Sequence, residues 1–524
     1  MRWTALVLVA SAMFFAYMFV DVLSPLQTML ETQVGWSADT YGTFASSEYF
    51  LNVFAFFLIF AGIILDKMGV RFTAILSGSV MVIGGAIKLY AISPYFVEGN
   101  ALYDFLNSFW TSFPANAKLA SAGFAIFGCG VEMAGITVSK AIVKWFTGKE
   151  MALAMGLEMA IARLGVFAVF RLSPFVANLG TPDVVRPVAV VGALLCVGLI
   201  SFIVYSFMDK KLDAQLGAAA AGEPEDPFKV SDLGKLFTSK TFLIVAGLCV
   251  LYYSAIFPFQ KYAVNMLQCN LTFTEVPAGS FWASEAVTIV QYIIMLIVAA
   301  TAFTSNFSKK PLKQIMLAVS CIFLVVYCYM GYMRQSAETI FAVFPLLAVG
   351  ITPILGKIVD YKGKAATMLI FGSILLVICH LTFAFILPLF KGNAVGGVIV
   401  AYVTILVLGA SFSLVPASLW PSVPKLVDEK VIGSAYSLIF WIQNIGLWLF
   451  PMLIGKILDA TNKGLVAEVN SGAISAEAAA TQYNYTAPLL MLACLGIAAL
   501  VLGIILKRVD KKKGLGLELP NVTE

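Results

Sequence analysis

Two oppositely charged residues, Glu132 and Arg163, stand in stretches of sequence that are otherwise apolar. An ionisable side chain at the centre of a bilayer costs about 2.5–3.5 kcal/mol on insertion scales, so each such residue indicates a functional site. A guanidinium group can bind a carboxylate through two parallel hydrogen bonds, and a carboxylate can bind an ammonium group. The two side chains can therefore pair with each other or hold the two ends of a zwitterionic solute.

The spacing of these residues predicts that they lie at the same depth. Glu132 precedes Thr147 by 15 residues and Arg163 follows it by 16, and the chain turns near Thr147 between two apolar segments. At about 1.5 Å per residue, both side chains lie roughly 22–24 Å from that turn. The alternative to a solute site is a permanent ion pair that only fastens two helices together.

Three further acids, Asp21, Glu48 and Glu158, lie within apolar segments. Buried carboxylates can take up and release protons during transport, so all three are candidates for proton coupling. Each also has an ordinary alternative, namely a helix cap for Asp21, a wet outer vestibule for Glu48 and an inner ion pair with a lysine for Glu158. Lys88 is expected to extend from its helix towards the lipid headgroups.

The composition supplies the membrane-spanning helices that these residues need. The chain has 524 residues, of which 60% are hydrophobic and 12% are charged, and soluble domains of this size do not have such a composition. Spans of about 20 apolar residues recur along the whole chain. Fourteen segments are predicted, near 4–26, 40–65, 72–93, 118–143, 152–178, 185–208, 241–264, 281–303, 313–333, 338–358, 365–390, 395–421, 432–456 and 485–506.

Several classes of function are excluded by what the sequence contains. The net charge of +5 is spread over short loops and forms no basic face for nucleic acid, so lipid is the expected partner. Eight cysteines stand singly, without a C-x-x-C motif, so we expect no metal site and no cofactor. No Walker loop or G-x-S-x-G motif occurs, which argues against an enzyme.

The loops predict an orientation and a division of the chain. Most of the 34 Lys and Arg residues fall in alternate loops, which places both termini in the cytoplasm. The long polar segment 209–240 is predicted to be a linker. We therefore predict an N-terminal six-helix bundle at 1–208, a C-terminal bundle at 241–506 and a cytoplasmic tail at 507–524.

A short loop motif occurs twice, after the second and after the tenth apolar segment. The first copy comprises Gly62, Asp66, Gly69 and Arg71, and the second places Asp360 between two glycines at the same offsets. This motif resembles the G-x-x-x-D-[RK]-x-G-[RK] loop of the major facilitator superfamily, whose two halves are parallel repeats. The resemblance implies an all-α fold of two six-helix bundles in which these loops act in gating. The two extra helices then form a hairpin inserted at about 275–335.

The sequence around the acid and the base carries a closer resemblance. Residues 127–132, the W-F-T-G-K-E turn at 145–150 and residues 162–165 resemble the lysosomal dipeptide-uniporter branch, that of major facilitator superfamily domain-containing protein 1. This implies a dipeptide or similar short peptide as substrate, with Arg163 on its carboxylate and Glu132 in the same charged site. Softer matches to the branch add these candidate binding residues: Tyr252, Tyr253, Phe257, Trp420, Gln443 and Asn444.

The chain also departs from that branch. Glu48 and Glu158 stand where the branch has Tyr and Gln, so proton symport stays open beside uniport. We predict a secondary transporter that works by alternating access. The alternatives are a carrier of organic anions or other nutrients and a non-transporting membrane receptor or scaffold.

The expected location follows from the start of the chain. The first apolar segment begins within about three residues of Met1, which leaves no room for the cytosolic sorting signal of the lysosomal branch. We therefore expect a bacterial inner membrane, a monomer and no accessory glycoprotein.

Overall fold

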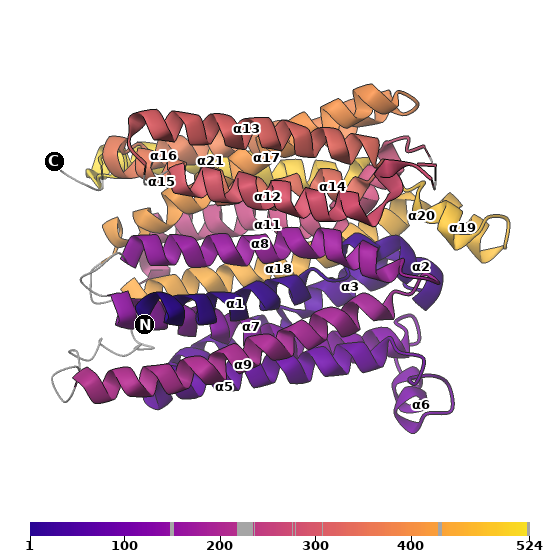
Figure 1. The fold of residues 1–524 in the computed structure, drawn as a ribbon, viewed down its shortest axis with the longest axis horizontal. Coiled ribbons are helices and arrows are strands. Elements are labelled where there is room, and N and C mark those ends of the chain that lie inside the picture. Colours follow the sequence, from indigo (N-terminus) through magenta and orange to yellow (C-terminus); the bar gives the residue numbers. More distant parts are fainter. Residues whose placement is uncertain are drawn as a thin grey trace. The chain divides into compact units, whose positions relative to one another are not determined.

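The computed structural model describes residues 1–146, 151–216, 234, 236–274, 276–277, 279–305, 308–427 and 432–520. Within these ranges the secondary structure is helical, without strands. Thirteen of the described helices are long and apolar enough to cross a membrane (Figure 1). This confirms the prediction of an all-α polytopic membrane protein.

The predicted span at 40–65 is not one continuous helix. It is divided among α3 (Ala38–Ser47), α4 (Phe50–Phe54) and the start of α5 (Phe57–Ala91). Phe56 has a φ of 51°, in the left-handed region that interrupts a helix of L-residues. This broken segment is therefore not one of the thirteen membrane-spanning helices. The other thirteen of the fourteen predicted segments each correspond to one of those helices.

The described chain packs into two compact units. One contains residues 1–261 and 427–463, and the other contains residues 262–426 and 464–524. The predicted linker at 209–240 falls largely outside the described residues, because 217–233 and 235 are not described. The division into bundles at that linker stays a prediction.

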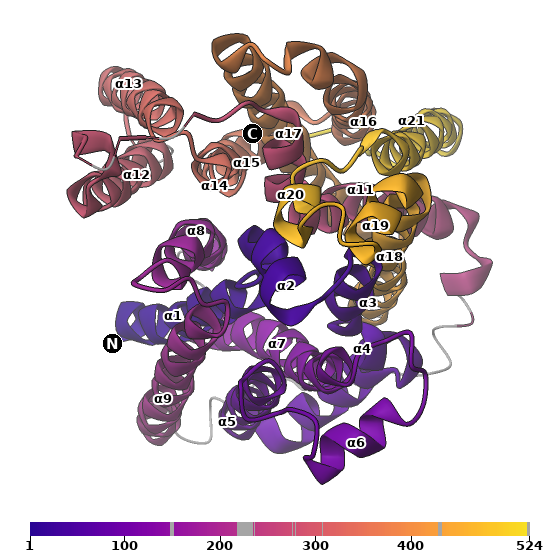
Figure 2. The same cartoon turned by 90° about the vertical axis from the view of Figure 1, so that its right-hand side faces the viewer.

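The first unit is a layered bundle in which α5 packs against α7 and α9, α1 packs against α8 and α9, and α18 runs along α3 (Figure 2). Besides α3, α4 and α5, the helices of this unit are α1 (Arg2–Val20), α2 (Gln27–Val34), α6 (Ala101–Asn107), α7 (Ala115–Phe146), α8 (Met151–Ala177), α9 (Val185–Leu216), α11 (Lys240–Asn270, as far as Lys261) and α18 (Ile432–Thr461).

Glycines allow the closest approach in this unit. A Cβ atom added to Gly128 on α7 would lie 1.8 Å from the backbone oxygen of Glu48. Small residues at such crossings let two backbones come together. Gly128 therefore determines how near the end of α3 lies to α7, and with it the position of Glu48.

The second unit contains the predicted hairpin. Within 275–335, α12 (Glu285–Ser305) and α13 (Lys310–Met333) pack against each other, and α12 also packs against α15. The unit further contains α14 (Ala337–Phe341), α15 (Val343–Lys362), α16 (Ala365–Leu381), α17 (Ala394–Ser422), α19 (Lys463–Asn470, from Gly464), α20 (Ala476–Ala480) and α21 (Thr486–Lys513).

The C-terminal tail folds back onto the start of α16. The first amides of a helix have no partner within the helix, and Lys364 provides no side-chain cap. The backbone oxygens of Glu518 and Leu517 accept hydrogen bonds from the amides of Lys364 and Ala365, both at 3.1 Å. The Glu518 carboxylate accepts two more from Thr367, from the amide at 2.8 Å and the hydroxyl at 2.7 Å. The tail therefore caps α16.

We predict that Glu518→Ala loosens the first turn of α16. Removal of a helix cap costs about 1 kcal/mol, which corresponds to roughly fivefold faster amide exchange at Thr367. Hydrogen exchange followed by mass spectrometry measures this. Glu468→Ala, at an exposed position of α19, is the control and should leave exchange at Thr367 unchanged. Equal exchange in both variants would contradict the capping role.

Candidate functional site

Arg163 lies on α8 between two aromatic rings. Its guanidinium carbon is 5.8 Å from the ring centroid of Tyr17 on α1 and 5.2 Å from that of Phe257 on α11. Both distances fall in the range of cation–π attraction. All three side chains are partly exposed. The rings therefore hold the guanidinium group in place while part of it stays accessible.

Glu132 lies on α7 and is also partly exposed. In the part of the chain that the structure describes, it forms no ion pair with Arg163. Its electrostatic neighbours are Glu48 and the amide of Asn444 on α18. That amide nitrogen is buried and has no other hydrogen-bond partner among the described residues. The acid and the base predicted for the site are thus not consumed by pairing with each other.

Tyr17 connects the charged residues of this unit. Its side chain lies within electrostatic range of Arg163, Glu158, Glu132 and Glu48. Glu158, earlier on the same helix as Arg163, interacts with the guanidinium group. Tyr17 could not be predicted as a site residue, because one tyrosine in an apolar helix carries no signal until its neighbours are known.

The softer candidates differ in their surroundings. Tyr253 stacks on Phe257 with a centroid distance of 5.5 Å, and Tyr252 is buried. Gln443 accepts a hydrogen bond from the Cys249 thiol at 3.3 Å, which is a structural contact within the unit. Trp420, near the end of α17, belongs to the second unit.

Asp21 and Glu48 both lie against Lys261. The Lys261 Nζ atom is 3.0 Å from Asp21 Oδ1 and 3.6 Å from Glu48 Oε2, and all three side chains are buried. Glu48 is buried, which contradicts the alternative of a wet outer vestibule. Lys261 was missed in the sequence, although the rule that selected Glu132 applies equally to a lysine in the span 241–264.

The prediction that Lys88 extends to the lipid headgroups is wrong. Its side chain is fully buried, and its Nζ atom lies 4.2 Å from the ring centroid of Phe124, 4.6 Å from Phe19 and 5.2 Å from Phe44. Its Nζ atom has no hydrogen-bond partner among the described residues. The three rings surround it inside the unit, where α5 packs against α7.

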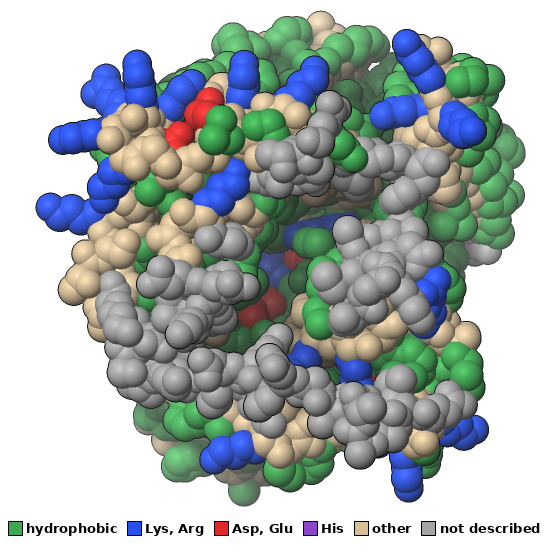
Figure 3. Space-filling model, turned by 90° about the vertical axis from the view of Figure 1, so that its left-hand side faces the viewer, with side chains coloured by type: hydrophobic (Ala, Val, Ile, Leu, Met, Phe, Trp, Pro, Cys, Tyr) green, Lys and Arg blue, Asp and Glu red, His purple; other side chains and the backbone are tan. Residues whose placement is uncertain are grey.

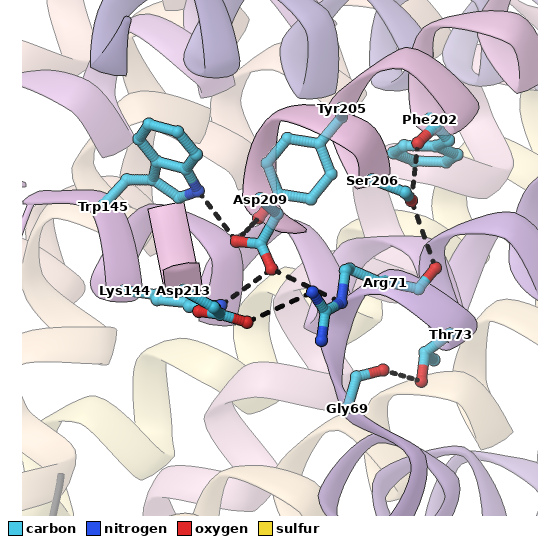
Figure 4. A network of polar contacts seen from close by, with 10 residues as sticks. All are labelled: Gly69, Arg71, Thr73, Lys144, Trp145, Phe202, Tyr205, Ser206, Asp209 and Asp213. Atoms are coloured by element: carbon cyan, nitrogen blue, oxygen red, sulfur yellow. Dashed lines mark hydrogen bonds and ion pairs between the residues drawn. The ribbon is translucent and has the colours of Figure 1, made fainter. Parts of the chain in front are cut away.

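The first copy of the loop motif is fastened to α9 by charge. Figure 4 shows Asp209, which is buried, at the centre of a polar network. It accepts hydrogen bonds from Lys144 at 2.7 Å and Trp145 at 3.1 Å, and it lies 3.9 Å from Arg71. Asp213 pairs with Arg71 at 3.2 Å and with Lys144 at 2.7 Å.

The two motif copies share a backbone feature. Gly69 has a φ of 77° and Gly363, at the same offset in the second copy, has a φ of 71°. Only glycine adopts this region without strain, which explains the residue type at both positions. Gly62 has open space around it. The side chains of Asp66 and Asp360 lie outside the described structure, so their gating role stays a prediction.

A family model described as Major Facilitator Superfamily matches residues 9–337. The lysosomal dipeptide transporter MFSD1 of Homo sapiens is 24% identical over 468 residues, covering 88% of this chain and 80% of the relative. MFSD1 of Danio rerio is 25% identical over 417 residues, covering 78% of this chain and 70% of the relative.

Solved structures resemble the whole chain. The nucleoside transporter NupG superposes with a TM-score of 0.59 at 10% identity, over 96% of this chain and 99% of that chain. A structure concerned with substrate recognition in proton-dependent oligopeptide transporters superposes with a TM-score of 0.58 at 12% identity, over 97% of this chain and 100% of that chain. At these identities the likeness concerns the fold alone.

We predict that Asp209→Asn lowers the apparent unfolding temperature of the purified protein. The change leaves Lys144 and Arg71 with a weaker partner, and because both are partly exposed the loss is about 1–3 kcal/mol. Asp213→Asn is the control, since that more exposed carboxylate contributes about 0–1 kcal/mol. Scans at one fixed heating rate compare them. A larger effect at Asp213 would contradict the central role of Asp209.

Proposed function

Because the chain belongs to the Major Facilitator Superfamily and has its fold, we propose that it carries dipeptides or similar small zwitterionic solutes by alternating access. It is an integral membrane transporter and not an enzyme. We propose the solute class and the transport mechanism; the family is shown by the sequence match.

The observation that carries the proposal is the separation of Arg163 and Glu132. Both are partly exposed, each interacts with different neighbours, and no ion pair joins them in the described structure. A solute with a free amino end and a free carboxylate end can contact both groups at once. Guanidinium presents a planar fork that fits a carboxylate. The buried Asn444 amide lies beside Glu132 and helps to position its carboxylate.

The relatives support the solute class. The proteins that match over most of the chain are named lysosomal dipeptide transporters, at 23–25% identity. The residues Tyr252, Tyr253, Phe257, Gln443 and Trp420 are proposed to line the path of the solute side chains. Gly62, Asp66, Gly69, Arg71 and Asp360 are proposed to act in gating.

Orientation, location and assembly are further parts of the proposal. The face drawn in Figure 3 carries many projecting Lys and Arg side chains. Such an excess is typical of a cytoplasmic face. We propose cytoplasmic termini, a bacterial inner membrane and a monomeric carrier.

We predict that Arg163→Ala weakens dipeptide binding by roughly ten- to a hundredfold, because a charge-assisted hydrogen bond contributes about 1.5–3 kcal/mol. Arg163→Lys should recover only part of the loss, since an ammonium group lacks the planar fork. Binding to purified protein and uptake into proteoliposomes measure both. Arg508→Ala, at an exposed position of α21, is the control. Unchanged dipeptide uptake in Arg163→Ala would rule out the site.

We predict that Glu132→Gln separates zwitterions from plain anions. A dipeptide needs both charged groups, so its binding should fall in Glu132→Gln as well as in Arg163→Ala. A carrier of organic anions needs only Arg163, and removal of a nearby negative charge should then leave binding unchanged or strengthen it. Binding assays with a dipeptide and with the same dipeptide acetylated at its amino end distinguish the two. Equal loss for both compounds in Glu132→Gln would contradict the zwitterion assignment.

A further inference from the structure

Lys261 is shared unequally between two buried acids. Asp21 is fully engaged, because its Oδ1 atom accepts from the Ser24 hydroxyl at 2.9 Å as well as pairing with Lys261, and its Oδ2 atom accepts from the Gln260 amide at 2.7 Å. Glu48 is held more loosely. Its Oε2 atom lies 3.6 Å from Lys261 and has no hydrogen bond among the described residues.

The remaining bonds of Lys261 do not depend on Glu48. Its ammonium group also donates to the backbone oxygen of Val20 at 3.2 Å. If Glu48 becomes neutral, Lys261 still has Asp21 and Val20 as partners. If Asp21 became neutral instead, a closer ion pair would be lost. Of the two acids, Glu48 is the one that can accept a proton at the smaller loss of interactions.

We propose that Glu48 is a proton-binding site that is coupled to the solute site, with Lys261 as its releasable counter-ion. A proton from water binds Glu48 Oε2, the carboxylate becomes a neutral carboxylic acid, and the ion pair with Lys261 ends. On release the proton returns to water and the ion pair forms again. The coupling to solute transport rests on the proposed function. Proton binding at Glu48 does not.

The groups around Glu48 come from every helix packed near it. Besides Asp21 and Lys261, they are Lys88 on α5, Tyr49 next in sequence, Glu132 on α7 and Tyr17 on α1. From α18, the uncharged Asn444 faces Glu132, whereas the charged Lys456 and Asp459 lie at Asp39, the other end of α3. With Glu48 ionised, three acids thus face two lysines around the site, and a proton on Glu48 removes the excess negative charge.

Coupling to the solute site runs through one turn of α11. Phe257, which lies against Arg163, and Lys261, which lies against Glu48, are four residues apart and therefore on the same face of the helix. Pro258 stands between them and cannot donate the usual helical hydrogen bond. A helix weakened there can bend. Loss of the Lys261–Glu48 pair therefore changes how this turn holds Phe257 against Arg163.

The test of the proton site needs no solute. Purified protein in detergent is titrated with a pH-indicator dye, and Glu48→Gln is expected to take up about one proton fewer than the unaltered protein. Asp21→Asn should keep this uptake, and Glu98→Gln, at an exposed loop position, is the matched control. Equal uptake by Glu48→Gln and the unaltered protein would overturn the proposal. Loss in Asp21→Asn but not in Glu48→Gln would assign the site to Asp21 instead, and would also overturn it.

A second measurement tests the coupling. In proteoliposomes that contain a dipeptide, Glu48→Gln should still exchange internal for external dipeptide, whereas a pH gradient should no longer drive accumulation. Gradient-driven accumulation equal to that of the unaltered protein and of Glu98→Gln would contradict coupling through Glu48. If the unaltered protein binds no dipeptide, the proposed solute class fails, while the dye titration still decides whether Glu48 binds a proton.

Discussion

A charge that is taken out of water must be held by well-placed partners, or it destabilises the protein that buries it. The first unit buries Lys261, Lys88, Asp21 and Glu48, and it does so in two ways. Lys261 has acids and a carbonyl group around it, whereas Lys88 has three aromatic rings. The ion pairs of Lys261 tie α11 to the ends of α1 and α3. That tie holds the turn of α11 whose Phe257 lies beside Arg163.

Close helix packing is what makes these ion pairs reachable. Gly128 brings α7 against the backbone of Glu48, and a Cβ atom added to Gly446 on α18 would lie 1.9 Å from the hydroxyl of Ser254 on α11. Without a hydrophobic driving force between helices in lipid, such contacts depend on close van der Waals packing and polar bonds. The glycines therefore act on function indirectly, since they fix the distances at which the charged groups interact.

The all-α fold class and thirteen of the fourteen membrane-spanning segments were predictable from the sequence, because span length and hydropathy are local properties. The break at Phe56 was not, since a non-glycine residue in the left-handed region has no signature in composition. Spacing predicts the height of Glu132 and Arg163 but not the side of the helix on which each lies, so it left open whether they pair. The roles of Tyr17 and Lys261 depend on contacts between distant segments. The capping of α16 by Glu518 likewise joins residues 151 positions apart.

The repeated loop illustrates how one backbone geometry can be stabilised by different interactions. Gly69 and Gly363 share a left-handed conformation at equivalent positions. Yet the first loop is fastened by the charges of Arg71, Lys144 and Asp209, whereas the second adjoins main-chain hydrogen bonds from the C-terminal tail. Salt screens ion pairs between partly exposed groups but affects main-chain hydrogen bonds far less. The two loops therefore respond differently to ionic strength, although the motif that marks them in the sequence is the same.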